Sequence, residues 1–79
     1  MAFYVRLRKL REDSAMAQYS FCADEQEAGE AVIDKHSGEV TVTRALAGTT
    51  GEALGMRAAA RLRTEWRRGP MPDATEWAS

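Results

Sequence analysis

The chain has 79 residues, of which 44% are hydrophobic and 29% are charged, and its formal net charge is −1. This composition is typical of one small folded domain spanning residues 1–79, and it excludes an intrinsically disordered chain. No apolar run approaches the ~18 residues that span a bilayer, and charges interrupt the N-terminal segment, so we expect a cytoplasmic protein without a membrane partner. The single Cys22 cannot form an internal disulfide, which fits a reducing compartment.

The first third of the sequence predicts two antiparallel strands. Hydrophobic and polar residues alternate over residues 2–11 and again over residues 15–23, a period of two that is typical of half-buried strands. The polar cluster at residues 12–14 predicts the turn between them. Residues 24–27 are too polar for a sheet interior, so we expect them to form a longer connection with one helical turn at most.

Residues 30–35 and 39–44 predict a second pair of strands, joined by the clearest turn signal in the chain. Asp34 can begin a type I turn and Gly38 can adopt a positive φ, which is the chemistry of a short hairpin loop with a bulge. We expect His36, at the tip of this loop, to be exposed to solvent. With no second histidine and one distant cysteine, the sequence offers no ligand set for a metal.

Residues 50–68 predict a long helix. Thr49 and Glu52 have the spacing of a capping box, and Gly69 followed by Pro70 supplies a stop signal. One stripe of the helical wheel is apolar and should lie on the sheet; it comprises Leu54, Ala58, Leu62 and Trp66. We therefore expect an α+β domain, in which a four-stranded antiparallel β-meander carries one C-terminal α-helix packed across one face.

The tail, residues 69–79, allows two structures. Asp73 and Glu76 have the spacing of a helix N-cap and its third residue, which predicts a single helical turn that folds Trp77 back onto the domain. The alternative is a disordered tail. The sheet face opposite the helix is likewise open to two interpretations, a solvated surface or half of a dimer interface.

Charge is segregated along the sequence. Residues 1–11 carry +4, residues 12–39 carry −7, residues 40–68 carry +4 and residues 69–79 carry −2. One interpretation is that the acidic middle segment lies beside the basic strand and helix in the fold. The other is a bipolar molecule whose positive face steers toward an acidic partner.

The residue types that carry catalysis are scarce. The sequence has one histidine, one cysteine, no glycine-rich phosphate loop and no G-x-S-x-G motif. Cys22 and His36 are expected on separate elements, and carboxylates such as those of residues 24–34 are usually only solvated on loops. We expect no catalytic residues, no cofactor and no enzyme, and a hydrolase that uses the acidic loop ranks last among the hypotheses.

Arginines supply the candidate binding residues. Four lie on the outward flanks of the predicted helix and two lie on the first strand beside a tyrosine; these partner-binding candidates are Arg57, Arg61, Arg63, Arg67, Arg6, Arg8 and Tyr4. We expect a non-catalytic interaction module that binds a protein partner, as an immunity or antitoxin-like factor does, or a second copy of itself as a homodimer. The alternative is a nucleic-acid-binding module that uses the same arginines together with Arg68, although a net charge of −1 gives none of the positive field typical of such domains.

Taken together, these motifs resemble a family of small uncharacterised bacterial proteins. The shared features are a basic first strand, an acidic middle, an I-D-x-x-[ST]-G-E-V hairpin and an A-A-x-x-L-R-x-x-W helix. Here the hairpin is Ile33 to Val40, the helix motif is Ala58 to Trp66, and the chain closes on Pro72-x-x-x-x-Trp77-Ala78-Ser79. The resemblance covers the whole chain and implies a shared fold, with no known activity or site.

Overall fold

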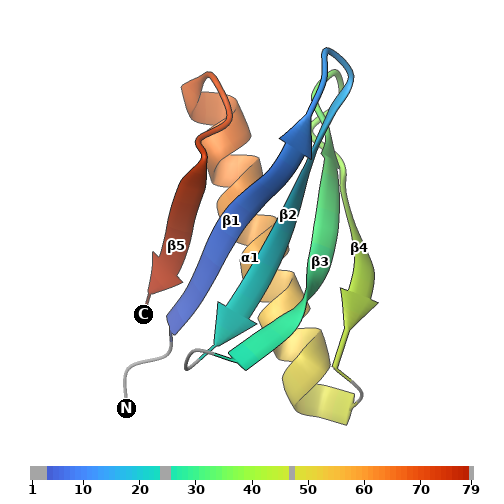
Figure 1. Ribbon diagram of the computed structural model, residues 1–79, viewed down its shortest axis with the longest axis vertical. Helices are drawn as coiled ribbons and strands as arrows, with labels where there is room; N and C mark the ends of the chain where they lie inside the picture. The colour runs from blue at the N-terminus through green and yellow to red at the C-terminus, as the bar shows by residue number, and fades with distance from the viewer. Residues whose placement is uncertain (1–3, 24–25, 47, 79) are drawn as a thin grey trace.

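The computed structural model describes residues 4–23, 26–46 and 48–78, and shows one antiparallel sheet with one helix (Figure 1). The elements in chain order are β1 (Tyr4–Glu12), β2 (Met16–Ala23), β3 (Gln26–Asp34), β4 (Val40–Ala45), α1 (Gly48–Arg68) and β5 (Ala74–Ala78). The predicted α+β class and antiparallel sheet are confirmed. None of the helices among the described residues is long and apolar enough to cross a membrane.

The sheet has five strands in the order β4-β3-β2-β1-β5, so the predicted count of four is wrong. The first four strands form the expected meander, and α1 then crosses behind the sheet from the β4 edge to the opposite edge (Figure 1). There the chain returns as β5, which pairs antiparallel with β1. This single crossing places the whole helix on one face, and no other described element covers the opposite face of the sheet.

The fifth strand replaces the helical turn predicted in the tail. The backbone N–H and C=O groups at the edge of β1 need hydrogen-bond partners, and the tail supplies them. The pairing begins at the hydrogen bond that the Lys9 N–H donates to the Asp73 carbonyl at 2.8 Å. Trp77 lies opposite Val5 in the β1–β5 register and packs against the core. The tryptophan therefore returns to the domain as expected, but on a strand.

The expected loop at residues 24–27 is also shorter than predicted, because β3 begins at Gln26. A β-bulge opposite the Phe21–Cys22 step accommodates this extension, since it lets Ala28 turn into the core while Glu27 stays exposed. Polar residues are tolerated here because this face of the sheet is open to solvent. Residues 24 and 25 lie outside the described part of the chain.

The core lies between α1 and the inner side of the sheet. Its largest fully buried side chains are Tyr19, Phe21, Leu7, Ile33, Leu62 and Val5. The predicted helical stripe faces this core, with Leu54, Ala58 and Leu62 buried and Trp66 packed against its margin. The helix begins at Gly48, two residues earlier than expected, and the Thr49 side chain of the predicted capping box lies outside the described residues.

The hairpin between β3 and β4 is fastened to the end of α1. The indole Nε1 of Trp66 donates a hydrogen bond to the Lys35 carbonyl at 2.8 Å. Gly38 has φ of 77°, and a Cβ at that position would lie 2.5 Å from the Trp66 ring. Glycine is therefore required twice over, for its backbone conformation and for the close approach of the indole.

Candidate interaction surface

The structure separates the seven predicted partner-binding residues into two groups on opposite sides of the sheet. Tyr4, Arg6 and Arg8 alternate with buried Val5 and Leu7 on β1, so they point away from the helix. The four candidate arginines of α1 lie on the helical side. A partner that covers one group cannot touch the other without wrapping around the domain.

Two of the helical arginines contact β5. The Arg57 guanidinium lies over the Trp77 ring, 5.1 Å from its centroid. Arg61 donates through Nε to Thr75 Oγ1 and through Nη2 to Glu65, both at 3.0 Å. Thr75 also donates to Glu65 at 2.5 Å, and this hydrogen bond together with the Arg61 charge lowers the pKa of the Glu65 carboxyl. These contacts attach the tail to the helix.

Arg63 and Arg67 lie on the other flank of α1 and are exposed. Neither has an ion pair within the ranges 4–23, 26–46 and 48–78. Met56, on the same outward side of the helix, is 72% exposed. This flank is a solvated helix surface with two available guanidinium groups.

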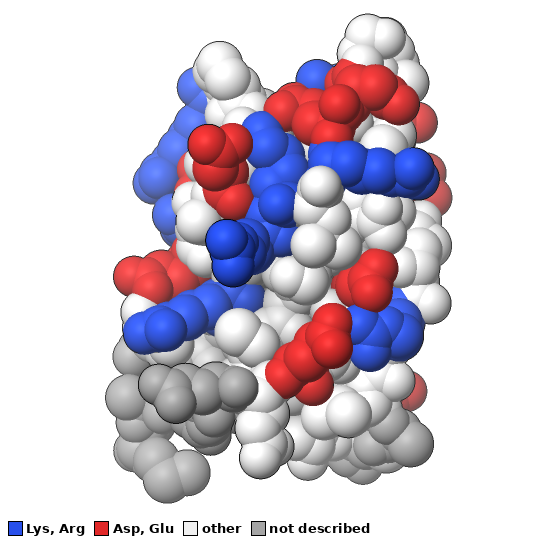
Figure 2. Space-filling model, viewed as in Figure 1, with Lys and Arg blue, Asp and Glu red and all other residues white. Residues whose placement is uncertain are grey.

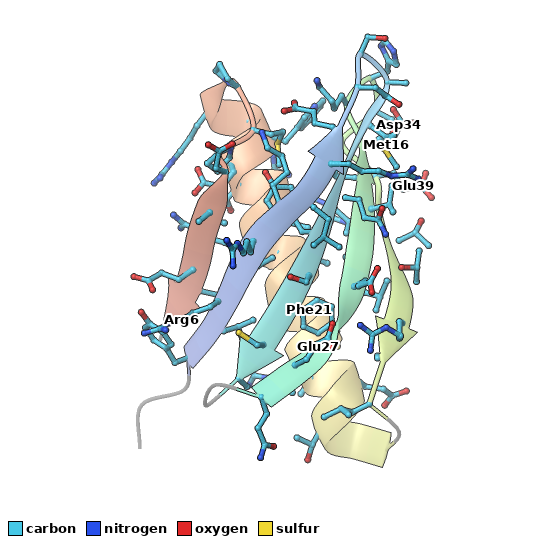
Figure 3. All side chains as sticks on the ribbon, in the orientation of Figure 1. Arg6, Met16, Phe21, Glu27, Asp34 and Glu39 are labelled. Carbon is cyan, nitrogen blue, oxygen red and sulfur yellow. The ribbon has the colours of Figure 1, made fainter. Side chains whose placement is uncertain are left out.

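The open face is the sheet surface opposite α1, and it carries the other three candidates. Its outward side chains include Tyr4, Arg6, Arg8, Met16, Gln18, Ser20, Cys22, Glu27, Glu30, Val32, Arg44 and Glu76. Figure 3 shows Arg6 and Glu27 on either side of β2. On the β5 side, the Tyr4 hydroxyl donates to the Glu76 carboxylate and the Arg6 guanidinium lies over the Tyr4 ring at 5.3 Å.

On the other side of the open face, Arg44 of β4 binds two carboxylates of β3. Its Nη2 atom lies 2.5 Å from Glu27 Oε1 and 2.8 Å from Glu30 Oε2. Glu30 also accepts a hydrogen bond from the Gln18 amide at 2.9 Å. Positive and negative side chains are thus interspersed with uncharged surface over this face (Figure 2).

The open face is hollowed in two places. A depression of about 850 Å³ lies around β1, β2 and β5; Arg6, Arg8, Ser20 and Cys22 of the open face line it, and so does Arg61 of α1, so it reaches past the sheet. A smaller one of about 490 Å³ lies where Met16, Val32, Asp34 and Glu39 approach one another near the hairpin end (Figure 3). Both hollows form where short or apolar side chains lie between longer charged ones.

A further group of charged residues joins the β1–β2 hairpin to the β3–β4 hairpin. Lys35 and Lys9 bind the Glu12 carboxylate at 2.7 and 2.6 Å, and these two ammonium groups lower the pKa of Glu12. Asp13 accepts hydrogen bonds from the backbone N–H groups of Ala15 and Met16, which lower its pKa. These groups order the turns.

The ion pairs favour the first interpretation of the segregated sequence charge. Acidic residues of the middle segment meet basic residues from both sides of it, as Glu12 meets Lys9 and Glu30 meets Arg44. The fold therefore brings acids of the middle segment beside bases of β1 and β4, whereas the helix arginines Arg61 and Arg68 form their ion pairs with Glu65 of the helix itself.

The expected alternation explains Tyr4, Arg6 and Arg8 but not the acidic half of the open face. β3 and β4 are paired with a register shift between Glu30 and Ala31, and this bulge brings Arg44 opposite Glu30. Together with the bulge at Glu27, it changes the phase of the alternation. The sequence did contain the residues of this ion pair, because the acids at 27 and 30 precede Arg44 on the neighbouring predicted strand.

Residues that could perform metal chemistry are dispersed. Within the described ranges, no three His, Cys, Asp or Glu residues are grouped so that they could hold a metal ion. Cys22 is half-buried on the open face, and Asp34 next to His36 accepts the backbone N–H bonds of its own turn.

No family model, curated protein or solved structure matches this chain.

Proposed function

We propose that the chain is a small non-catalytic interaction module that binds a protein partner through the open face of its sheet. The observation that carries the proposal is that this face lacks a covering element in the described structure while bearing apolar and uncharged groups between its charges. An antiparallel sheet can leave one face in water, and the outward side chains of such a face are commonly polar. Here Tyr4 is 36% exposed, and Met16 and Val32 are accessible in part.

The other surfaces support this choice of docking face. The inner flank of α1 is used by the core, and Arg57 and Arg61 are used by β5. The central strand β2 presents uncharged side chains on this face and its neighbours present charged ones, and such a mixture of polar and apolar area is typical of non-obligate protein interfaces. We therefore infer a cytoplasmic binding protein, in the manner of an immunity or antitoxin-like factor, whose lone cysteine fits a reducing compartment.

Co-purification from a bacterial host tests this proposal. The tagged chain, the open-face variant Val32→Glu and the helix-face control Met56→Glu are compared after each is shown to unfold cooperatively. The proposal predicts a stoichiometric protein partner that Val32→Glu loses and Met56→Glu retains. Retention of the same partner by Val32→Glu, or its loss with Met56→Glu alone, contradicts the proposed face.

A nucleic-acid ligand is the second candidate, and one observation favours it. Tyr4, Arg6 and Arg8 form a row on an exposed strand, where an aromatic ring and two guanidinium groups could contact bases and phosphates. The Tyr4 hydroxyl and the Arg6 guanidinium already contact groups of this chain, which weakens the case. A salt titration with labelled single-stranded DNA and RNA decides it, because binding absent at low salt, or indifferent to salt, removes this candidate.

A further inference from the structure

We propose that the partner on the open face is a second copy of this chain, related to the first by a two-fold axis that runs along β2. The inference rests on the proposed function, because it uses the same face. It is carried by the order of charges across the central strands. β1 presents arginines on this face, β2 presents uncharged side chains and β3 presents glutamates.

The strand register places these charges in two rows that cross the sheet. In each row an arginine of β1 lies opposite a β2 residue, which lies opposite a glutamate of β3; the rows are Arg6, Cys22, Glu27 and Arg8, Ser20, Glu30. Each row therefore reads positive, neutral, negative. Arginine and glutamate in a row are two strands apart, roughly 9.6 Å between backbones, so they are not paired with each other within the chain.

A two-fold rotation about an axis along β2 exchanges the two sides of each row. When two open faces are stacked in this way, Arg8 of one copy lies over Glu30 of the second copy, and the reciprocal pair forms at the same time. An axis running across the strands would instead stack β1 on β1 and bring arginine over arginine. The charge pattern thus favours an axis along β2 over an axis across the strands.

After the ion pairs within the chain are counted, the β1 side of the open face remains positive and the β3 side remains negative. Arg44 offsets one of the two charges of Glu27 and Glu30, and Glu76 offsets one of the two charges of Arg6 and Arg8. One half of the face keeps a positive excess and the other half a negative excess. Matching potentials of this kind set the register of an interface and suppress wrong partners.

The shape of the face permits the contact. The small side chains of Ser20 and Cys22 form the middle of the rows and line the 850 Å³ depression, so the two β2 strands meet over short side chains. Strands of five to nine residues in a five-stranded sheet give a face of roughly 600 Å². Two such faces bury about 1,200 Å², the lower end of specific interfaces, which predicts a reversible dimer.

Charge reversal on the 8–30 row tests the proposed axis by sedimentation velocity over a concentration series. Arg8→Glu brings a carboxylate over Glu30 of the second copy, and Glu30→Arg brings a guanidinium over Arg8, so each variant should weaken self-association about ten-fold or more. An equimolar mixture of the two variants should associate as strongly as the wild-type chain, because both reciprocal contacts then join opposite charges. Wild-type chain that stays monomeric, or variants that self-associate unchanged, would overturn the proposal.

A second measurement does not depend on the folding of charge variants. Cys22 lies next to the proposed axis, and the facing sheets are ~10 Å apart, too far for a disulfide but within reach of a short bismaleimide. The wild-type chain should give a covalent dimer whose yield rises with concentration. In the control, Cys22→Ala with Met56→Cys moves the thiol to the exposed helix face and should give none. Equal yields from the two thiols would contradict the axis.

The outcomes also separate this inference from the proposed function. The homodimer is disproved if the chain is monomeric at all concentrations. If another protein then co-purifies with the wild-type chain and is lost from the Val32→Glu variant, the open face remains a docking surface for that protein. A homodimer joined through the rows, with no other protein retained, supports the inference and identifies the partner.

Discussion

At the scale of single residues, the contact between Trp66 and Gly38 explains why the hairpin and helix motifs occur together. The indole fills the space that a side chain at position 38 would occupy, and its N–H binds the hairpin backbone at Lys35. The turn chemistry at Asp34 and Gly38 could be predicted from the sequence. The docking of the turn on Trp66 could not, because it depends on how far α1 extends along the sheet.

Gly38→Ala should lower the free energy of unfolding by about 2 kcal/mol or more, since it adds a clash with the indole to the cost of a positive φ. In a Trp66→Ala background the clash disappears, and the same substitution should cost only about 1 kcal/mol. Urea unfolding of the four chains measures the difference. Equal costs in both backgrounds would show that the ring does not occupy this position.

Leu62→Ala and Trp66→Ala should each lower the free energy of unfolding by about 2–5 kcal/mol, because both side chains pack between α1 and the sheet. Met56→Ala is the matched control on the exposed side of the helix and should change stability by less than about 0.5 kcal/mol. Thermal melting distinguishes the two sets. A large effect at Met56 with none at Leu62 would mean that the helix is rotated.

Acid should destabilise the fold, and Glu65 should contribute to this. Hydrogen bonds and the Arg61 charge hold the pKa of Glu65 below its ordinary value of 4.5, and backbone N–H groups hold that of Asp34 below 3.8. The unfolded chain therefore takes up protons at a higher pH than the folded chain. Stability should be constant between about pH 5 and neutrality and should fall as the pH drops through 4.5 and below.

Glu65→Gln should lessen this acid dependence, because it removes one group whose pKa differs between the two states. Urea unfolding at a series of pH values measures the slope. A variant with the same decline as the wild-type chain would show that Glu65 is not held ionised by Thr75 and Arg61.

At the scale of elements, the four strands of the meander and the helix could be recognised from hydrophobic periodicity, but the fifth strand could not. The Asp73 and Glu76 spacing also fits a helical turn, and a five-residue strand has too little alternation to outweigh it. The tail becomes a strand because the edge of β1 is free to pair with it, and this edge exists only in the folded sheet. The bulges in β3 and β4 were equally invisible, and they hid Glu27 and Arg44 from the predicted binding residues.

Removal of residues 74–79 should destabilise the domain severely, with a loss of about 3 kcal/mol or more, because it exposes the β1 edge and removes the packing of Trp77. The point variant Thr75→Val should cost about 1 kcal/mol, since it breaks only the hydrogen bonds to Glu65 and Arg61. Guanidinium unfolding followed by tryptophan fluorescence tests both. Wild-type stability after truncation would show that β5 is not part of the cooperative unit.

At the scale of the whole molecule, the arginines that dominate the sequence do not form one surface. The sheet separates Arg6 and Arg8 from those of α1, and two of the latter attach the tail. Alternation along β1 was enough to predict which residues face outward there. The flank of the helix that meets β5 could not be predicted, because it depends on the return of the chain along β1. Arg57 and Arg61 lie on that flank and therefore have a structural role.

The most direct test of the open face as the docking surface is a two-dimensional ¹H–¹⁵N NMR experiment on the wild-type chain at increasing concentration. Self-association along β2 predicts that the amide signals of Gln18, Ser20 and Cys22, with those of their row neighbours on β1 and β3, shift progressively. The signals of Met56 and Arg63 on the exposed helix surface should stay in place. Shifts confined to the helix surface, or none at any concentration, would contradict the assignment of the open face to a second copy of the chain.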